Sequence, residues 1–215
     1  MGKQKEKEDN RKLSKAEQKR KEQFELLKGK MESEGYVQED LTIGIVYANV
    51  MAIVLCLPIV ILLAVPFQLV NEGKEMTWSL PYEGLLVLAA FFVLIVVHEL
   101  IHGITWAYYA PSHWKSVSFG FMVQYLTPYC TCNEPLKKSQ YIIGALMPTL
   151  VLGVLPAIVS IVTGRWMLFA LSALMIFGGG GDLTIILKLL RYREKEETIF
   201  VDHPYQCGLV AFVKK

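Results

Sequence analysis

The sequence predicts an α-helical membrane protein with four transmembrane helices and a short cytoplasmic β-hairpin between the second and the third. Two observations lead to this fold class. The chain of 215 residues is 53% hydrophobic and also 20% charged, and the two kinds of residue are segregated along it. The apolar residues gather into runs longer than the ~20 residues that a helix needs to cross a bilayer.

Composition divides the chain into three parts. Residues 1–38 form a charged arm with eleven Lys or Arg among many Glu and Gln, which we expect to be a solvated or partly helical cytosolic segment. It carries neither a nucleic-acid-binding motif nor the features of a cleavable signal peptide. Residues 39–190 form the membrane core, and residues 191–215 form a cytosolic tail.

The four expected spans differ in their regularity. They cover residues 41–70, 84–109, 141–162 and 166–190. Two prolines in the first span and two in the third are expected to kink those helices, which membrane helices tolerate when neighbours satisfy the freed carbonyls. The segment 111–138 lacks a long apolar run, and we expect a hairpin there, with strands 117–124 and 129–132 joined by a turn at 125–128.

The distribution of Lys and Arg predicts the orientation. Twenty of the 22 lie in the arm, the hairpin segment and the region from the end of the fourth span onward, and two lie in the remaining connections. By the positive-inside rule, both termini and the hairpin are therefore expected on the cytoplasmic side of a plasma membrane.

The second span contains the sequence His98-Glu99-Leu100-Ile101-His102. Histidines four residues apart share one face of a helix, so both imidazoles can bind one zinc ion, and Glu99 can take a proton from water. This is the H-E-x-x-H arrangement of zinc hydrolases. Three such groups within a membrane helix are costly, by ~2–3 kcal/mol for a charged one. The alternative is that they serve only hydrogen bonds to neighbouring helices, but the spans offer Glu99 almost no basic partner.

Asp182 is the leading candidate for a third zinc ligand. It is the only acidic residue in the fourth span, and it follows four consecutive glycines, which let helices approach closely. Counting residues back from the cytoplasmic ends of the second and fourth spans, we expect the histidines and Asp182 at a similar depth, roughly 10–16 Å below the cytoplasmic surface. The alternative is a carboxylate that only caps a helix after a glycine break.

Other polar residues are weaker candidates. Asn133 and Glu134 reach the site only if the hairpin folds back into the bundle, where they would contact substrate. Asp202 and His203 belong to an expected turn in the tail. Cysteines 130 and 132 could point the same way on a strand and bind a metal, but they are more simply ordinary thiols.

The combination of HELIHG in a membrane helix, YCTCNEPLKK after a hairpin and GGGGDL in a later helix resembles a known family. It is a bacterial membrane family of putative zincin peptidases, similar to the site-2 proteases, the zinc intramembrane metalloproteases. The resemblance covers about residues 77–208. It implies His98, His102 and Asp182 as zinc ligands, Glu99 as general base, and an edge strand of the hairpin that holds an unwound substrate helix. Site-2 proteases usually carry an Asn beside the third ligand to stabilise the oxyanion, and no Asn stands next to Asp182.

The sequence therefore predicts a zinc-dependent intramembrane metalloprotease that hydrolyses peptide bonds in or near membrane segments. Its expected partners are the lipid bilayer and a membrane-protein or peptide substrate, without nucleic acid. Two alternatives remain. A zinc-binding scaffold or chaperone needs no base at Glu99, and a metal transporter is disfavoured because the motif is not repeated in the other half of the chain.

Overall fold

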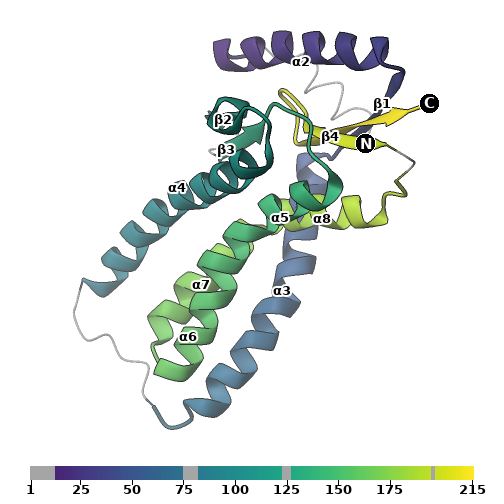
Figure 1. Cartoon of the computed structure of the whole chain (residues 1–215). Coiled ribbons are helices and arrows are strands. Elements are labelled where there is room, and N and C mark those ends of the chain that lie inside the picture. Colours follow the sequence, from purple (N-terminus) through teal and green to yellow (C-terminus); the bar gives the residue numbers. More distant parts are fainter. Residues whose placement is uncertain (1–12, 75–81, 123–126, 195–196) are drawn as a thin grey trace.

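The computed structural model describes residues 13–74, 82–122, 127–194 and 197–215. Long helices form an elongated bundle, and the strands gather at one end of it beneath a helix that crosses the top of the view (Figure 1). In chain order the helices and strands are α2 (Lys15–Ser33), β1 (Tyr36–Thr42), α3 (Ile45–Val70), α4 (Glu83–Tyr109), η1 (His113–Ser116), β2 (Val117–Met122), β3 (Thr127–Cys132), α5 (Lys138–Pro148), η3 (Thr149–Val154), α6 (Leu155–Thr163), α7 (Trp166–Gly178), α8 (Gly180–Arg191), β4 (Thr198–Asp202) and β5 (Gly208–Lys214).

Within the described ranges, three helical segments are long and apolar enough to cross a membrane. They are α3, α4 and the continuous run Lys138–Thr163. The third begins as α5, passes through the π-helical turn η3 directly after Pro148, and continues as α6. Pro148 cannot donate a backbone hydrogen bond, and a wider turn after it accommodates the missing donor.

The fourth expected span is a broken helix rather than a continuous one. Helices α7 and α8 together have the length and apolarity of a span, but they are bent by 48° with respect to each other. The break falls among the four glycines, where a helix is least stable. The described part of the chain therefore offers three helices long enough to be spans and one bent pair that could make a fourth.

The two ends of the chain meet in a sheet that the sequence did not predict. Strand β5 lies between β1 and β4 and is antiparallel to both. The expected arm and tail are thus joined by backbone hydrogen bonds. On one face of this sheet, α2 packs through Phe24 and Met31 against Val201, Val210 and Phe212.

The expected hairpin is present as β2 and β3, with different bounds. The two strands pair antiparallel from Val117 opposite Cys132 to Met122 opposite Thr127. Strand β3 thus begins before residue 129, because this register runs without interruption through residues 127 and 128, which were expected in the turn. Residues 123–126 lie outside the described part of the chain. The hairpin packs on α4, where Phe119 lies so close to Gly103 that a Cβ there would stand 2.5 Å from the ring.

Candidate metal centre

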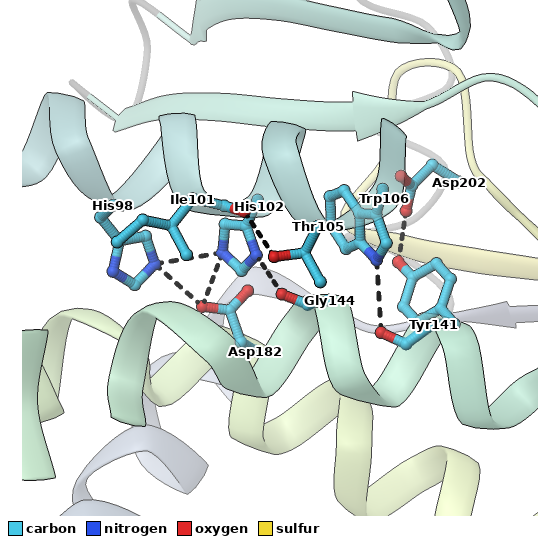
Figure 2. A network of polar contacts seen from close by, with 9 residues as sticks. All are labelled: His98, Ile101, His102, Thr105, Trp106, Tyr141, Gly144, Asp182 and Asp202. Atoms are coloured by element: carbon cyan, nitrogen blue, oxygen red, sulfur yellow. Dashed lines mark hydrogen bonds and ion pairs between the residues drawn. The ribbon is translucent and has the colours of Figure 1, made fainter. Parts of the chain in front are cut away.

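The two motif histidines lie on α4, one helical turn apart, and both side chains are buried. Because most of α4 is apolar, the buried imidazoles depend on polar groups of other helices for hydrogen bonds. Those groups come from α5 and α8, where the carbonyl of Gly144 contacts His102 and the carboxylate of Asp182 contacts His98 (Figure 2). The site is therefore assembled from three helices that are distant in the sequence.

Three side-chain atoms converge on one point. The Nε2 atoms of His98 and His102 lie 3.1 Å apart, and Oδ2 of Asp182 lies 3.2 Å from the first and 3.3 Å from the second. Figure 2 shows Asp182 pointing up from α8 between the two rings. The sequence expectation that Asp182 shares a level with the two histidines thus agrees with the structure, which groups these three residues as a possible metal cluster.

The hydrogen bonding of His102 favours a cation at this point. Its Nδ1 lies 2.9 Å from the carbonyl oxygen of Gly144, which can only accept, so Nδ1 carries the proton. In the neutral ring, Nε2 then presents a lone pair towards the Asp182 carboxylate and the other imidazole. A metal ion or a shared proton is needed to make this convergence of acceptors favourable.

The separations fit zinc. Two ligand atoms at ~2.0–2.1 Å from a tetrahedral zinc ion lie ~3.3–3.4 Å apart. The three observed separations of 3.1–3.3 Å are close to that edge length, so small side-chain movements are sufficient to admit the ion. Two imidazoles and one carboxylate, with a fourth position left for water, are a donor set typical of catalytic zinc.

The break between α7 and α8 places Asp182 at the site. Asp182 lies in the first turn of α8, where a carboxylate interacts favourably with the helix dipole. Helix α8 also packs closely on α3: a Cβ at Gly180 would lie 2.3 Å from Cβ and 2.8 Å from Cα of Ala52. The glycine therefore sets how near α8 can lie to α3, and with it the position of Asp182.

Two neighbouring glycines provide a matched test of this packing. We expect Gly180→Ala to destabilise the folded protein by ~1–3 kcal/mol, because the added methyl group meets backbone that must shift. Gly181→Ala should leave stability unchanged or raise it by ~0.5–1 kcal/mol, since nothing lies within 4 Å of its Cβ position and alanine favours the helix. Thermal unfolding of both variants in the same detergent measures the difference, and equal melting temperatures would contradict the packing.

A second layer of contacts holds His102 in place. Besides its bond to the carbonyl of Gly144, the ring stacks on Trp106, with centroids 4.9 Å apart and planes at 13°. The indole Nε1 of Trp106 donates to the carbonyl oxygen of Tyr141 at 3.3 Å. A side chain at position 144 would collide with this indole, at 2.0 Å from Nε1, so glycine is needed there. Such outer contacts fix the tautomer and the orientation of a metal-binding histidine.

Glu99 lies next to the three converging residues and lines the same pocket. This cavity of about 200 Å³ has His98, His102 and Asp182 on one wall and β3 on another. The backbone amide of Cys130 in β3 faces the Glu99 carboxyl group and can donate to it. Since a single water occupies ~30 Å³ of liquid, the pocket has room for several waters beside the carboxylate.

Asp202 reaches this pocket from the end of β4. Its Oδ2 accepts a hydrogen bond of 2.7 Å from the backbone N–H of Cys132, and its Oδ1 accepts one from the hydroxyl of Tyr141. Burial raises the pKa of Asp202 to about 6, although these two hydrogen bonds oppose the increase. At neutral pH the group is therefore mostly ionised and able to accept both bonds.

The remaining candidates lie apart from the metal cluster. Asn133 donates to Oγ of Ser118 and Glu134 accepts from the backbone of Ser112, so both stabilise the hairpin, and neither is among the described residues that line the pocket. Burial raises the pKa of the Cys130 and Cys132 thiols. Neither thiol belongs to the group of described residues whose ligand atoms converge, which consists of His98, His102 and Asp182.

Several residues of the site were not predicted from the sequence. Trp106 could have been found, since it follows His102 by four residues and so lies on the same helix face. The carbonyl of Gly144 and the hydroxyl of Tyr141 had no distinguishing feature in the sequence. Asp202 was a weaker candidate, placed in an expected turn of the tail, and its contacts with Cys132 and Tyr141 become visible once β4 is placed beside β5.

Comparison with known proteins supports the same region. A family model described as putative zincin peptidase matches residues 91–196, a segment that contains the H-E-x-x-H motif, the hairpin and Asp182. This match agrees with the putative zincin peptidase family that the sequence resembles. No curated protein and no solved structure gives a significant match.

Proposed function

We propose that this chain is a zinc-dependent intramembrane metalloprotease, since residues 91–196 match the putative zincin peptidase family. It hydrolyses peptide bonds in or near membrane-spanning segments of its substrates. The observation that carries the proposal is the convergence of His98, His102 and Asp182 within 3.1–3.3 Å, beside Glu99 and in a pocket walled by a β-strand.

Each residue has a distinct role in the proposed reaction. His98, His102 and Asp182 hold the ion, and the contacts of His102 with Gly144 and Trp106 keep its Nε2 directed at that position. Zinc bound in this site would act as a Lewis acid that polarises the scissile carbonyl and makes the attacking water more acidic. A carboxylate oxygen of Glu99 accepts a proton from the attacking water, and Glu99 then donates this proton to the leaving amine.

The hairpin holds the substrate. Strand β3 forms one wall of the pocket, and the edge of β3 that points away from β2 runs past Glu99. An extended peptide added along this edge would bring its backbone next to the catalytic base. A substrate helix must therefore unwind locally before it is cut.

The bent pair α7–α8 acts as the fourth span in this proposal. With four crossings, the positive-inside rule places both termini and the hairpin on the cytoplasmic side of a bacterial plasma membrane. The site then lies near that side, where water can enter. Lipid and a membrane-embedded protein or peptide are the expected partners.

Cleavage in a reconstituted system tests the proposed function. We expect the purified protein in lipid nanodiscs to cut members of a panel of single-span membrane peptides. Cutting should stop with 1,10-phenanthroline and return when zinc is added back. Cleavage that is insensitive to the chelator would contradict the proposal, and zinc binding without cleavage of any peptide would favour a scaffold.

A further inference from the structure

The pocket is covered from the side of the sheets by two segments of the chain ends. Glu17 and Arg20 of α2 line it, together with the turn 203–207 that connects β4 to β5. Both side chains are charged but only 6% and 7% exposed. Burying charged groups is unfavourable unless specific partners compensate, so their position over the pocket needs an explanation.

Arg20 connects three segments that meet above the pocket. Its Nε donates to the carbonyl oxygen of Pro204 in the turn at 3.0 Å, and its guanidinium lies 4.4 Å from the ring centroid of Tyr129 in β3. Helix α2 is attached to the sheet through Phe24 and Met31. The contacts of Arg20 add a link from the N-terminal half of α2 to the turn and to β3.

Asp202, the last residue of β4 and the one directly before this turn, occupies the edge of β3. The backbone N–H of Asn133 donates to the carbonyl oxygen of Ser116, so residue 133 is hydrogen-bonded towards β2. In an antiparallel pair, successive residues of a strand direct their N–H groups alternately towards and away from the partner strand. The amides of residues 130 and 132 therefore point away from β2. The amide of Cys130 faces Glu99, and that of Cys132 donates to Asp202 at 2.7 Å. Residue 128 is proline and has no N–H. Asp202 thus occupies an amide that an added strand would need.

We propose that α2 and the β4–β5 turn form an autoinhibitory latch, closed in this structure, in which Arg20 holds the turn over the pocket and Asp202 occupies the β3 edge in place of substrate. That the latch excludes an extended peptide rests on the proposed function. The latch itself is a property of the fold. Opening it moves the turn together with the adjoining end of β4, which frees the amide of Cys132 and exposes the pocket to the side of the sheets.

Arg20→Ala in the full-length protein opens the latch, because it removes both the hydrogen bond and the contact with Tyr129. The loss of two such contacts is expected to raise the open population about tenfold. Hydrogen–deuterium exchange of the Cys132 amide should accelerate by that factor, and EDTA should remove zinc faster in proportion. Lys19→Ala is the matched control, since it removes an exposed charge from the same helix.

A reversible tether tests the latch in the opposite direction. In the wild type, Nζ of Lys21 lies 5.6 Å from the centroid of the Tyr205 ring. The test protein carries Lys21→Cys and Tyr205→Cys in a Cys207→Ser background, and a cleavable bis-maleimide joins the two new cysteines. Tethered protein should cut the membrane peptides at least about tenfold more slowly than the same protein after the linker is cleaved, while exchange at Cys132 slows. Each single-cysteine protein, treated identically, controls for modification.

The outcomes separate the latch from the proposed function. If no peptide is cut by any variant, the protease proposal fails, but faster exchange at Cys132 in Arg20→Ala alone still supports the latch. Equal exchange in wild type, Arg20→Ala and Lys19→Ala overturns the latch, whatever the cleavage results. An active tethered protein also overturns it.

Discussion

Glu99→Gln should reduce peptide cleavage by ~10²–10⁴-fold while the protein keeps its zinc. The amide has the shape of the carboxylate but cannot accept a proton at neutral pH, so the water that attacks the substrate is no longer activated. The ligand atoms of His98, His102 and Asp182 are untouched. Two measurements on the same preparation, the rate of peptide cleavage and the zinc content, distinguish loss of the base from loss of the ion.

Glu72→Gln is a suitable control for this variant. Glu72 is an exposed glutamate after the end of α3, and it does not line the pocket. It should cleave at the wild-type rate. A Glu99→Gln protein that remains as active as this control would show that another group serves as base, and a Glu99→Gln protein without zinc would leave the base unassigned.

Asp182→Asn should lose zinc. An uncharged amide is a poor ligand, and removing the carboxylate leaves two imidazoles whose Nε2 atoms are 3.1 Å apart. Loss of an outer partner of a zinc ligand already weakens binding ~10–100-fold, so we expect loss of the ligand itself to weaken binding by ~100-fold or more. Competition with a chromogenic zinc chelator measures the affinity directly, and cleavage should fall with zinc occupancy.

Asp202→Asn is the matched control, because it neutralises the other aspartate of the same pocket. Asp202 bonds to Tyr141 and the backbone of Cys132 rather than to the histidines, so zinc affinity should be unchanged. The reverse result, in which Asp202→Asn loses zinc and Asp182→Asn retains it, would exchange the roles of the two aspartates.

The convergence of His98, His102 and Asp182 could be predicted because each of them had a local feature in the sequence. Histidines at positions i and i+4 share a helix face wherever the helix lies. Asp182 was noticeable because it is a single acid in an apolar run, next to glycines that break the helix. The long apolar helices followed from the requirements of a bilayer, which permit few alternatives to a helix.

The sheet of the chain ends could not be predicted in the same way. Strands β1 and β5 pair although they are separated by almost the whole chain, and no local pattern indicates such a partner. The apolar run in β5 is short and follows a polar turn, and a charged segment precedes β4, so the tail had a mixed composition. The positions of Arg20 and Asp202 over the pocket depend on this pairing, so they were also inaccessible from the sequence.

The bend between α7 and α8 was foreseen only as a weak point in a helix. Glycines lower helix stability, but they do not determine whether a helix bends or where it leads. That depends on the close packing of Gly180 against Ala52 of α3, a contact between distant segments. The sequence thus predicted that Asp182 is unusual, and the packing explains how it reaches the histidines.

X-ray absorption at the zinc edge of the purified wild-type protein tests the metal centre most directly. We expect about one zinc per chain, bound by two imidazole nitrogens and by oxygen ligands at ~2.0–2.2 Å, as His98, His102, Asp182 and a water would give. Protein purified without stoichiometric zinc that also fails to bind added zinc, or a spectrum with sulfur ligands at ~2.3 Å, would contradict the assignment of the site.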